Sequence, residues 1–262
     1  MVVMAALRDD LRLALDRAEF ARAVGLKPDP WQEKLLRSSS DRVLLNCCRQ
    51  SGKSTMAALI GLHRAIYHPG SLILILAPAE RQAKETFAKV AEMYASASPG
   101  GASRAISPES YRKLGMEFSN RSRIEALPGT EKTIRGFSGT ALLILDEAAR
   151  VADELYFAVR PMLAISGGAL MMLTTPYGKR GIFYEEWTSG AGRGWERYEV
   201  TAEECPRISP EFLEEERDAL PSWVYRQEYE CSFEETEDQV FTYEMVERAV
   251  TAEVTPLFGG AA

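Results

Sequence analysis

Cys47-Cys48-Arg49-Gln50-Ser51-Gly52-Lys53-Ser54-Thr55 is the stretch that decides the fold of this chain. It lies between an apolar run, Val43 to Leu45, and a run of helical character, Met56 to Tyr67. This order predicts a strand, a loop and a helix. Backbone N–H groups of such a loop, together with the positive end of the helix dipole, favour phosphate oxygens. The sequence therefore predicts a phosphate-binding loop.

The end of the loop matches the pattern G-x-x-x-x-G-K-[ST], although Cys47 stands where the pattern has its first glycine. In that pattern Lys53 would reach the β- and γ-phosphates of a nucleotide, and the Ser54 hydroxyl would complete a Mg²⁺ shell. An ordinary helix start is the alternative for this fragment alone. The residues expected to contact the nucleotide are Cys48, Arg49, Gln50, Ser51, Gly52, Lys53, Ser54 and Thr55.

A pair of carboxylates ends a second apolar run. Four aliphatic residues, Leu142 to Leu145, precede Asp146 and Glu147. Ligands bind at the carboxyl ends of parallel strands, so we expect Asp146 to hold Mg²⁺ and Glu147 to orient and deprotonate an attacking water. A strand that ends in solvated acids is the alternative, but its coincidence with Gly-Lys-Ser makes ATP with Mg²⁺ the expected ligand.

The remaining hydrophobic pattern alternates between strands and helices, which favours an α/β fold with a mostly parallel sheet. Runs at Ser71–Pro78 and Ala169–Leu173 predict core strands, and Met116–Leu127 predicts a β-hairpin. A further strand is expected at 197–200, and helices at 4–24, after Pro30, at 80–94, at 211–220 and at 223–229. We expect the apolar stripe of the first helix to pack on the domain.

Composition is that of an ordinary globular chain: 262 residues, 46% hydrophobic and 26% charged, enough for one α/β domain with an appendage. Lysine and arginine number 31 and aspartate and glutamate 38, so the net charge is 31 − 38 = −7, which excludes a uniformly basic nucleic-acid coat but allows a local basic strip.

No apolar run approaches the roughly 18 residues of a membrane span, and no signal-peptide pattern is present, so we expect a cytoplasmic protein without a membrane partner. The four cysteines lack C-x-x-C spacing, which argues against a zinc site or disulfides.

Two further segments carry polar side chains suited to nucleotide chemistry. Gln32 follows a proline-rich break, and its amide can donate to N7 of adenine and accept from the N6 amino group. Thr174-Thr175-Pro176 ends an apolar run, where the hydroxyls could bond the γ-phosphate or the lytic water. The alternatives are a solvated glutamine on an entry helix and a strand closed by turn residues.

Taken together, these segments resemble the ATPase domain of bacteriophage terminase large subunits, the motors that package DNA into empty capsids. The resemblance covers about Trp31 to Glu235, and its most specific part combines the Arg49–Ser54 loop, Asp146-Glu147-Ala148 and Thr174-Thr175-Pro176. It implies a P-loop NTPase fold of the additional-strand, catalytic-glutamate (ASCE) type, with the Thr-Thr-Pro strand between the strands that carry Lys53 and Asp146. It also assigns Thr174-Thr175-Pro176 to coupling hydrolysis to motion.

The resemblance further implies an ATPase core with an N-terminal helical extension at 1–199, a lid subdomain at 200–245 and a linker or terminal segment at 246–262. Family members carry a nuclease domain with metal-binding aspartates, for which no room follows Val250. We therefore expect a motor domain alone, cut from a longer protein and without nuclease activity. The implied partners are double-stranded DNA, the portal of a procapsid, the terminase small subunit and further copies in a ring, expected to be a pentamer, with a monomer in isolation left open. The implied location is the cytoplasm of a bacterial host of a phage or prophage.

Arginines are expected to complete the hydrolytic site, because an arginine finger on the γ-phosphate supplies ~10³–10⁵ in rate. Arg49, inside the loop, is the candidate in cis; Arg135, in a glycine-flanked loop, is the candidate in trans, and we favour Arg135. For DNA, cations must contact backbone phosphates without reading bases. The DNA-contact candidates are Arg104, Arg112, Lys113, Arg121 and Arg123, each with a solvated surface residue as the alternative.

Three other interpretations stay open at this point. Another P-loop DNA translocase or helicase would share the loop and the carboxylates but would normally bring a second motor core. A non-hydrolysing, nucleotide-dependent scaffold would not need Glu147. A small-molecule kinase would need an acceptor pocket and lid arginines.

Overall fold

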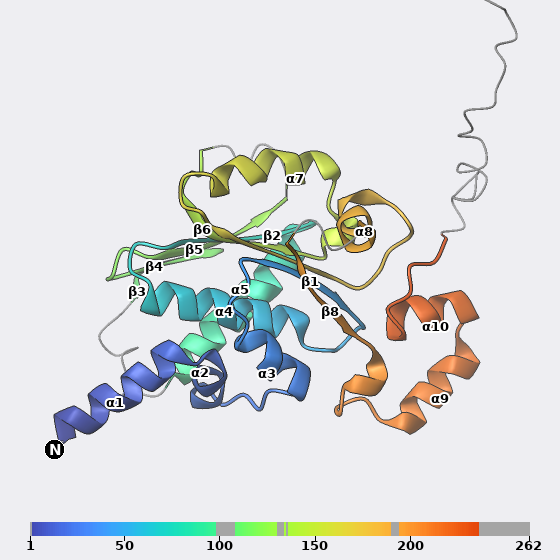
Figure 1. Ribbon diagram of the computed structural model, residues 1–262, viewed down its shortest axis with the longest axis horizontal. Coiled ribbons are helices and arrows are strands. Elements are labelled where there is room, and N and C mark those ends of the chain that lie inside the picture. The colour runs from blue at the N-terminus through green and yellow to red at the C-terminus, as the bar shows by residue number, and fades with distance from the viewer. Residues whose placement is uncertain (1, 98–107, 130–133, 135, 190–193, 236–262) are drawn as a thin grey trace, which may run out of the picture.

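An eight-stranded sheet forms the centre of the molecule in the computed structural model, which describes residues 2–97, 108–129, 134, 136–189 and 194–235. The strand order is β3-β4-β5-β2-β6-β7-β1-β8 (Figure 1). The strands are β1 (Arg42–Cys47), β2 (Leu72–Ala77), β3 (Pro108–Arg112), β4 (Gly115–Phe118), β5 (Arg123–Pro128), β6 (Thr140–Asp146), β7 (Ala169–Thr174) and β8 (Glu196–Val200).

The sheet is parallel from β5 to β8 and antiparallel only where β4 pairs with β5 and with β3. The β4–β5 pair is the hairpin expected from the alternating sequence at 116–127. Strand β7 lies between β1 and β6, as the ASCE resemblance implies. Because parallel strands share one carboxyl edge, the ends of β1, β6 and β7 meet there.

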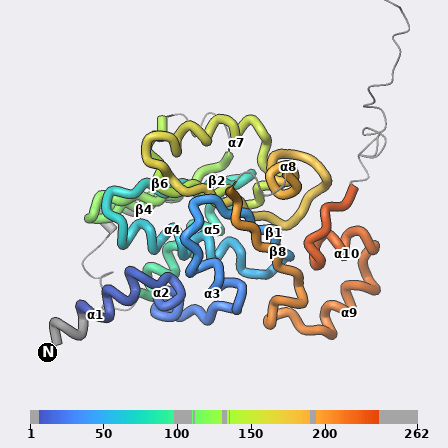
Figure 2. The backbone as a smooth tube through the Cα atoms, viewed as in Figure 1, coloured from blue at the N-terminus to red at the C-terminus, as the bar shows by residue number. Residues whose placement is uncertain are grey.

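Helices cover both faces of the sheet (Figure 1). One face carries α1 to α5, and the other carries α7 and α8. The helices are α1 (Val2–Leu15), α2 (Arg17–Ala23), α3 (Pro30–Leu36), α4 (Lys53–Tyr67), α5 (Glu80–Ser96), α7 (Asp153–Val159), α8 (Gly181–Thr188), α9 (Pro210–Ala219) and α10 (Ser222–Tyr229). Figure 2 shows the chain leaving β8 and folding into α9 and α10 beside the core.

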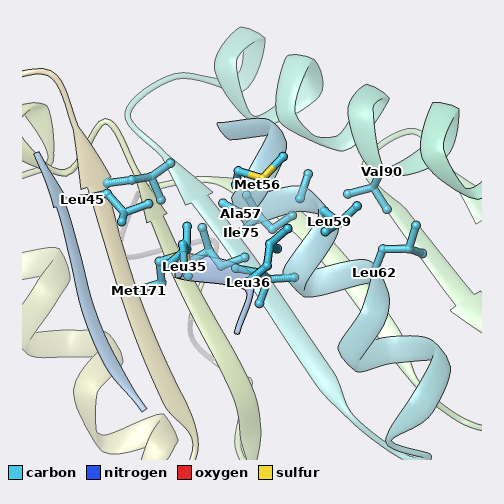
Figure 3. Packing of buried hydrophobic residues seen from close by; sticks show 14 of the residues in the cluster. Leu35, Leu36, Leu45, Met56, Ala57, Leu59, Leu62, Ile75, Val90 and Met171 are labelled. Carbon is cyan, nitrogen blue, oxygen red and sulfur yellow. The ribbon is translucent and has the colours of Figure 1, made fainter. Parts of the chain in front are cut away.

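Successive strand residues feed two separate cores, because side chains alternate across a strand. In β1, Leu45 joins the cluster beneath α4 and α5, whereas Leu44 joins the cluster beneath α7 and α8. Figure 3 shows Leu59 of α4, Val90 of α5 and other buried side chains of the first cluster. Each fully buried aliphatic side chain contributes about 1.5–3 kcal/mol, so α4 and its loop are firmly anchored to the sheet.

Helix α4 lies very close to the sheet at Gly61. A Cβ atom there would come within 3.3 Å of Ile73 Cγ2 and 3.6 Å of Ile144 Cδ1. Glycine costs a helix interior about 1 kcal/mol relative to alanine, and here it permits the close approach. The close packing of α4 therefore fixes the position of the preceding loop relative to the carboxyl ends of the strands.

The N-terminal helix differs from the expectation in two ways. It breaks at Asp16, which caps α2 by accepting from the Ala18 amide at 2.8 Å. In addition, Leu7, Leu11 and Leu15 of α1 are exposed, with Leu15 at 85%, so the prediction that this stripe packs on the domain is wrong for α1. The prediction used helical periodicity, which fixes which residues share a face but not what that face meets.

Within the described residues, we find no helix that combines the length and the apolar character needed to cross a membrane.

Candidate active site

The loop between β1 and α4 is shaped by left-handed backbone and by anchors outside the loop. Gly52 has φ +88°, a left-handed backbone that favours glycine, and a Cβ there would lie 2.9 Å from Gln32 Nε2. The Cys48 amide donates to the Val200 carbonyl at 2.9 Å, and the Arg49 amide donates to the Glu228 carbonyl at 3.1 Å. The start of the loop is thus tied to β8 and α10.

Lys53, the first residue of α4, joins two segments that lie far away in sequence. Its Nζ donates to Thr175 Oγ1 at 2.8 Å and forms an ion pair with Glu147 Oε1 at 3.6 Å. The lysine is only 7% exposed. The structure therefore brings the loop, the carboxylates after β6 and the Thr-Thr-Pro segment after β7 to one point.

Asp146 is held by three donors. Ser54 Oγ donates to Oδ1 at 3.2 Å, the Glu147 amide donates to Oδ1 at 3.1 Å, and Thr86 Oγ1 donates to Oδ2 at 2.6 Å. A hydroxyl and a carboxylate at this separation are the oxygen ligands that Mg²⁺ takes in phosphate sites, where water and phosphate complete the octahedron. The donor set at Ser54 and Asp146 fits that ion.

Glu147 has φ +54°, a left-handed backbone that costs a residue with a side chain about 1–3 kcal/mol. Such strain persists where the surroundings enforce it. Here the Asp146 carboxylate accepts the Glu147 amide, and the Glu147 side chain turns to Lys53. The strained turn therefore presents two adjacent carboxylates to the same site.

A cavity of about 690 Å³ opens above these groups. It is lined by the loop from Arg49 to Thr55, by Glu147 and Thr175, and by Arg81, Gln82, Glu85, Lys89 and Arg150. This volume is in the range of small-molecule sites. Because arginines and a lysine from outside the loop also line it, the cavity suits an anion with several phosphates.

Gln32 holds the loop in this structure. Its Oε1 accepts from the Asp29 amide at 3.0 Å, and its Nε2 donates to the Ser51 carbonyl at 3.1 Å. It also lines an adjoining hollow of about 380 Å³ with Gly25, Leu26, Lys27, Gly52, Thr55, Met56 and Arg207. Gln32 thus stands beside a space next to the loop, although its carbonyl oxygen is already engaged.

Arg207, which the sequence did not single out, links three segments. Its Nη1 pairs with Asp29 Oδ2 at 2.6 Å, and its Nη2 donates to the Ser51 carbonyl at 2.8 Å. The arginine lies between β8 and α9. It therefore connects the segment between β8 and α9 to the loop and to the start of α3.

Of the two arginine-finger candidates, the structure describes only Arg49. Arg49 Nε forms an ion pair with Glu228 of α10, and its side chain is 62% exposed. Arg49 also lines the large cavity, so it contacts both this space and α10. Arg135 lies outside the described residues.

The Thr-Thr-Pro segment is tied to the segment after Glu147. Thr174 Oγ1 donates to the Thr175 carbonyl at 2.7 Å and accepts from the Ala149 amide at 3.3 Å. Arg150 stacks on the Tyr177 ring at 3.9 Å. Hydrogen bonds therefore link the residues that follow Glu147 to the end of β7.

None of the four DNA-contact candidates that the structure describes lines the cavity above Lys53 and Glu147. Arg112 pairs with Glu117 at 3.4 Å and with Glu125 at 3.6 Å, and Lys113 pairs with Glu80 at 3.2 Å. Arg121 occupies the hairpin turn with φ +68°, and Arg123 begins β5. Arg104 lies outside the described residues.

The cysteines pack around the loop. Cys47, Cys48, Cys205 and Cys231 are buried free thiols, and the Cys48 and Cys205 sulfurs are 3.7 Å apart. Burial raises the pKa of Cys231 to about 12 and raises the pKa of Cys47 as well. These two thiols are neutral at physiological pH and serve as small apolar groups.

Comparison with known proteins identifies relatives of this chain. The family profile "Terminase large subunit, T4likevirus-type, N-terminal" matches residues 44–248. A curated "Terminase, large subunit" of Thermus phage G20c is 27% identical over 255 residues, which cover 86% of this chain and 52% of that protein. The chain spans about half the length of the curated relatives it matches.

Solved structures show the same fold. The large terminase ATPase domain of Thermus phage P74-26 matches with a TM-score of 0.71 at 24% identity, over 82% of this chain and 98% of that one. The large terminase of a thermophilic bacteriophage, solved in complex with ADP, matches with a TM-score of 0.65 at 12% identity, over 79% of this chain and 54% of that one. The ASCE-type P-loop fold expected from the sequence is confirmed.

Proposed function

Because the chain belongs to the family of terminase large subunits of the T4likevirus type, as their N-terminal part, we propose that it is an ATP-hydrolysing motor for DNA packaging. The observation that carries this proposal is the meeting of Lys53, Glu147 and Thr175 beside Asp146 at the carboxyl edge of the sheet. A loop of amides with a buried ammonium binds phosphates, and a neighbouring carboxylate can work on water. The described residues thus offer a phosphate-binding loop and a candidate base side by side.

Binding is assigned to the loop and its neighbours. The loop amides and Lys53 would hold the β- and γ-phosphates, while Ser54 and Asp146 would hold Mg²⁺, whose positive charge would offset that of the phosphate oxygens. Gln32, beside the adjoining hollow, is proposed to face the adenine through its remaining Nε2 hydrogen.

Glu147 is proposed as the group that orients and deprotonates the attacking water. In this structure it pairs with Lys53. When a γ-phosphate binds the Lys53 ammonium, the phosphate replaces Glu147 as the partner of the lysine. Glu147 then becomes free to accept a proton from water. The competition links phosphate binding to activation of the base.

Thr174, Thr175 and Pro176 are proposed to couple hydrolysis to motion. Thr175 shares Lys53 with the phosphate site, and Thr174 accepts from the segment that follows Glu147. A change at the γ-phosphate would therefore alter the bonds at the end of β7. The lid, proposed to span 200–245, would sense the same change through Arg49 and Glu228.

The completing arginine is proposed to be Arg135 from a neighbouring subunit, with Arg49 in cis as the alternative. A ring of identical chains would place each Arg135 beside the next site.

For DNA contact, Arg121 and Arg123 are better candidates than Arg112 and Lys113, because the latter two are paired with carboxylates. Arg104 remains a DNA-contact candidate on sequence grounds.

The proposed partners are those that the family implies. They comprise double-stranded DNA, a portal on a procapsid and a terminase small subunit, in a phage-infected bacterial cytoplasm. The segment 246–262 is proposed to be a linker. Packaging of duplex DNA without strand separation would distinguish this motor from a helicase.

Two variants test the assignment by phosphate release and nucleotide affinity. Glu147→Gln keeps the shape of the side chain, so ATP should still bind while turnover falls ~10²-fold or more. Lys53→Ala should lose binding as well as turnover. Phosphate release by Glu147→Gln equal to that of the wild type would refute the catalytic role and favour a nucleotide-dependent scaffold.

A further inference from the structure

A second cavity lies at the edge of the sheet opposite the nucleotide site. Its volume is about 240 Å³, and its floor includes Val43, Leu142 and Ala169, which stand near the starts of β1, β6 and β7. These strands run parallel, and the nucleotide site lies at their other ends. We call this space, between Arg17 and Arg64, the basal cavity.

Basic side chains converge on the basal cavity. Arg17 begins α2, Arg64 lies in the last turns of α4, and His63 and His68 also line the space. Arg17 donates to the Ser38 carbonyl, and the Nε atom of Arg64 is buried without a hydrogen-bond partner in the described chain. Within the same residues, neither arginine forms an ion pair.

The two arginine cations are close enough to act on each other and on His68. Burial, and then the charge of Arg64, lowers the pKa of Arg17. Burial, and then the charges of Arg64 and Arg17, lowers the pKa of His68. Like charges held together away from water cost free energy unless an anion joins them.

The carboxylates nearby do not fill that role. Asp16, next to Arg17 in sequence, offsets only part of this effect on the pKa of Arg17 and is itself paired with Arg37 at 3.2 Å. Glu196 accepts from Ser38 and, at 2.6 Å, from Tyr198. Asp41 lines the cavity but is exposed and forms no ion pair that the described residues show.

We propose that the basal cavity binds a phosphate group, with Arg17 and Arg64 as its ligands. A guanidinium carries paired N–H donors that match phosphate oxygens, Arg17 keeps donors beyond the one that the Ser38 carbonyl accepts, and Ser39 lines the same cavity. The phosphate would be a free anion or part of a nucleic-acid backbone, which share this chemistry. Arg64 lies ~16 Å along α4 from Lys53, so the site is distinct from the nucleotide loop.

Calorimetry on the full chain tests the proposal once the nucleotide loop is saturated with a non-hydrolysable ATP analogue and Mg²⁺. Inorganic phosphate should then bind at one further site. Arg64→Met and Arg17→Met should each weaken this binding about tenfold or more, because each removes a bidentate partner. The matched control is Arg22→Met on α2, an arginine paired with Glu19 and Glu33 outside the cavity, which should leave phosphate affinity unchanged.

Thermal unfolding separates a ligand role from a structural one. Phosphate should raise the unfolding midpoint of the wild type but not that of Arg64→Met, and Arg64→Lys should keep part of the shift. Without phosphate, Arg64→Met should unfold at the same temperature as the wild type or higher, since it relieves repulsion. No phosphate binding by the wild type, or binding by both methionine variants equal to that of the wild type, would overturn the site.

The source of the phosphate is decided by competition. A short DNA duplex that displaces inorganic phosphate from the wild type, and binds more weakly to both methionine variants, would assign the site to a nucleic-acid backbone. Binding of free phosphate without such competition would assign it to a small anion. ATP hydrolysis by Arg64→Met should match the wild type, so this proposal and the motor proposal fail independently.

Discussion

Thr86 of α5 bears directly on the proposed Mg²⁺ site, although it is not one of the ligands. Its hydroxyl donates to Asp146 Oδ2 at 2.6 Å and is buried. Groups that orient a metal ligand typically change metal affinity about 10–100-fold. Thr86→Val keeps the shape but removes this donor, so the Mg²⁺ concentration for half-maximal phosphate release should rise about tenfold. Thr86→Ser should restore it, and an unchanged Mg²⁺ dependence in Thr86→Val would contradict the orienting role.

His63 makes a separate prediction about stability. Burial is the main cause that lowers the pKa of His63 to about 4, against about 6.5 in an unfolded chain. The unfolded state therefore binds more protons between these values, and stability should fall as the pH drops from about 6.5 towards 4. Denaturant unfolding at about pH 7.5 and about pH 5 should show a loss of about 1–2 kcal/mol from this residue. His63→Leu should show a correspondingly smaller pH difference; an equal difference would count against the argument.

Single residues of the site differ in how far the sequence reveals them. Gly52, Lys53 and Asp146 belong to local patterns, a loop before a helix and acids after a strand, so they are found without a structure. Thr86 lies inside an amphipathic helix and has no local mark. Its contact with Asp146 exists only because α5 packs against the sheet, which no local pattern encodes.

At the scale of elements, Arg207 connects the segment after β8 with the loop and with the start of α3. This bridge shapes the loop before any nucleotide arrives, so it should favour the ground state and the transition state equally. Arg207→Lys replaces two nitrogens that are held apart in a planar fork by a single ammonium nitrogen, so it should keep only one of the two bonds in good geometry. We expect KM for ATP to rise roughly five- to tenfold with kcat little changed. Arg217→Lys on α9, which stacks on Tyr225, is the control; a fall in kcat alone would refute a binding role for Arg207.

The elements themselves were predictable where burial is complete. Strands β2, β6 and β7 are continuous apolar runs because both of their faces are covered, and such runs are visible in sequence. Strand β3 was not predicted, since it exists only through pairing with β4 at the sheet edge. The break at Asp16 was missed because periodicity continues across it, while the cap that begins α2 is a single hydrogen bond.

At the scale of the whole molecule, the sheet brings together segments that are far apart in sequence. Strand β7 joins β1 to β6, so the loop and the carboxylates meet through a strand that lies between their own. The fold class followed from the alternation of strands and helices, but the position of β7 came from the family resemblance. What a second subunit adds has no trace in a single chain, which makes an assembled ring the place to test it.

Mixing two inactive variants in the assembled motor tests whether Arg135 acts on a neighbouring site. A subunit with Arg135→Ala has an intact phosphate-binding loop, and a subunit with Lys53→Ala has an intact Arg135. In a random equal mixture, half of the sites have an intact loop and half of those receive an intact arginine, so activity should recover to ~25% of the wild type. Lys53→Ala mixed with Glu147→Gln is the control and should stay inactive, because these two groups lie 3.6 Å apart in one chain. Full activity of Arg135→Ala alone would instead favour Arg49 in cis, and no recovery above the control would refute action of Arg135 across subunits.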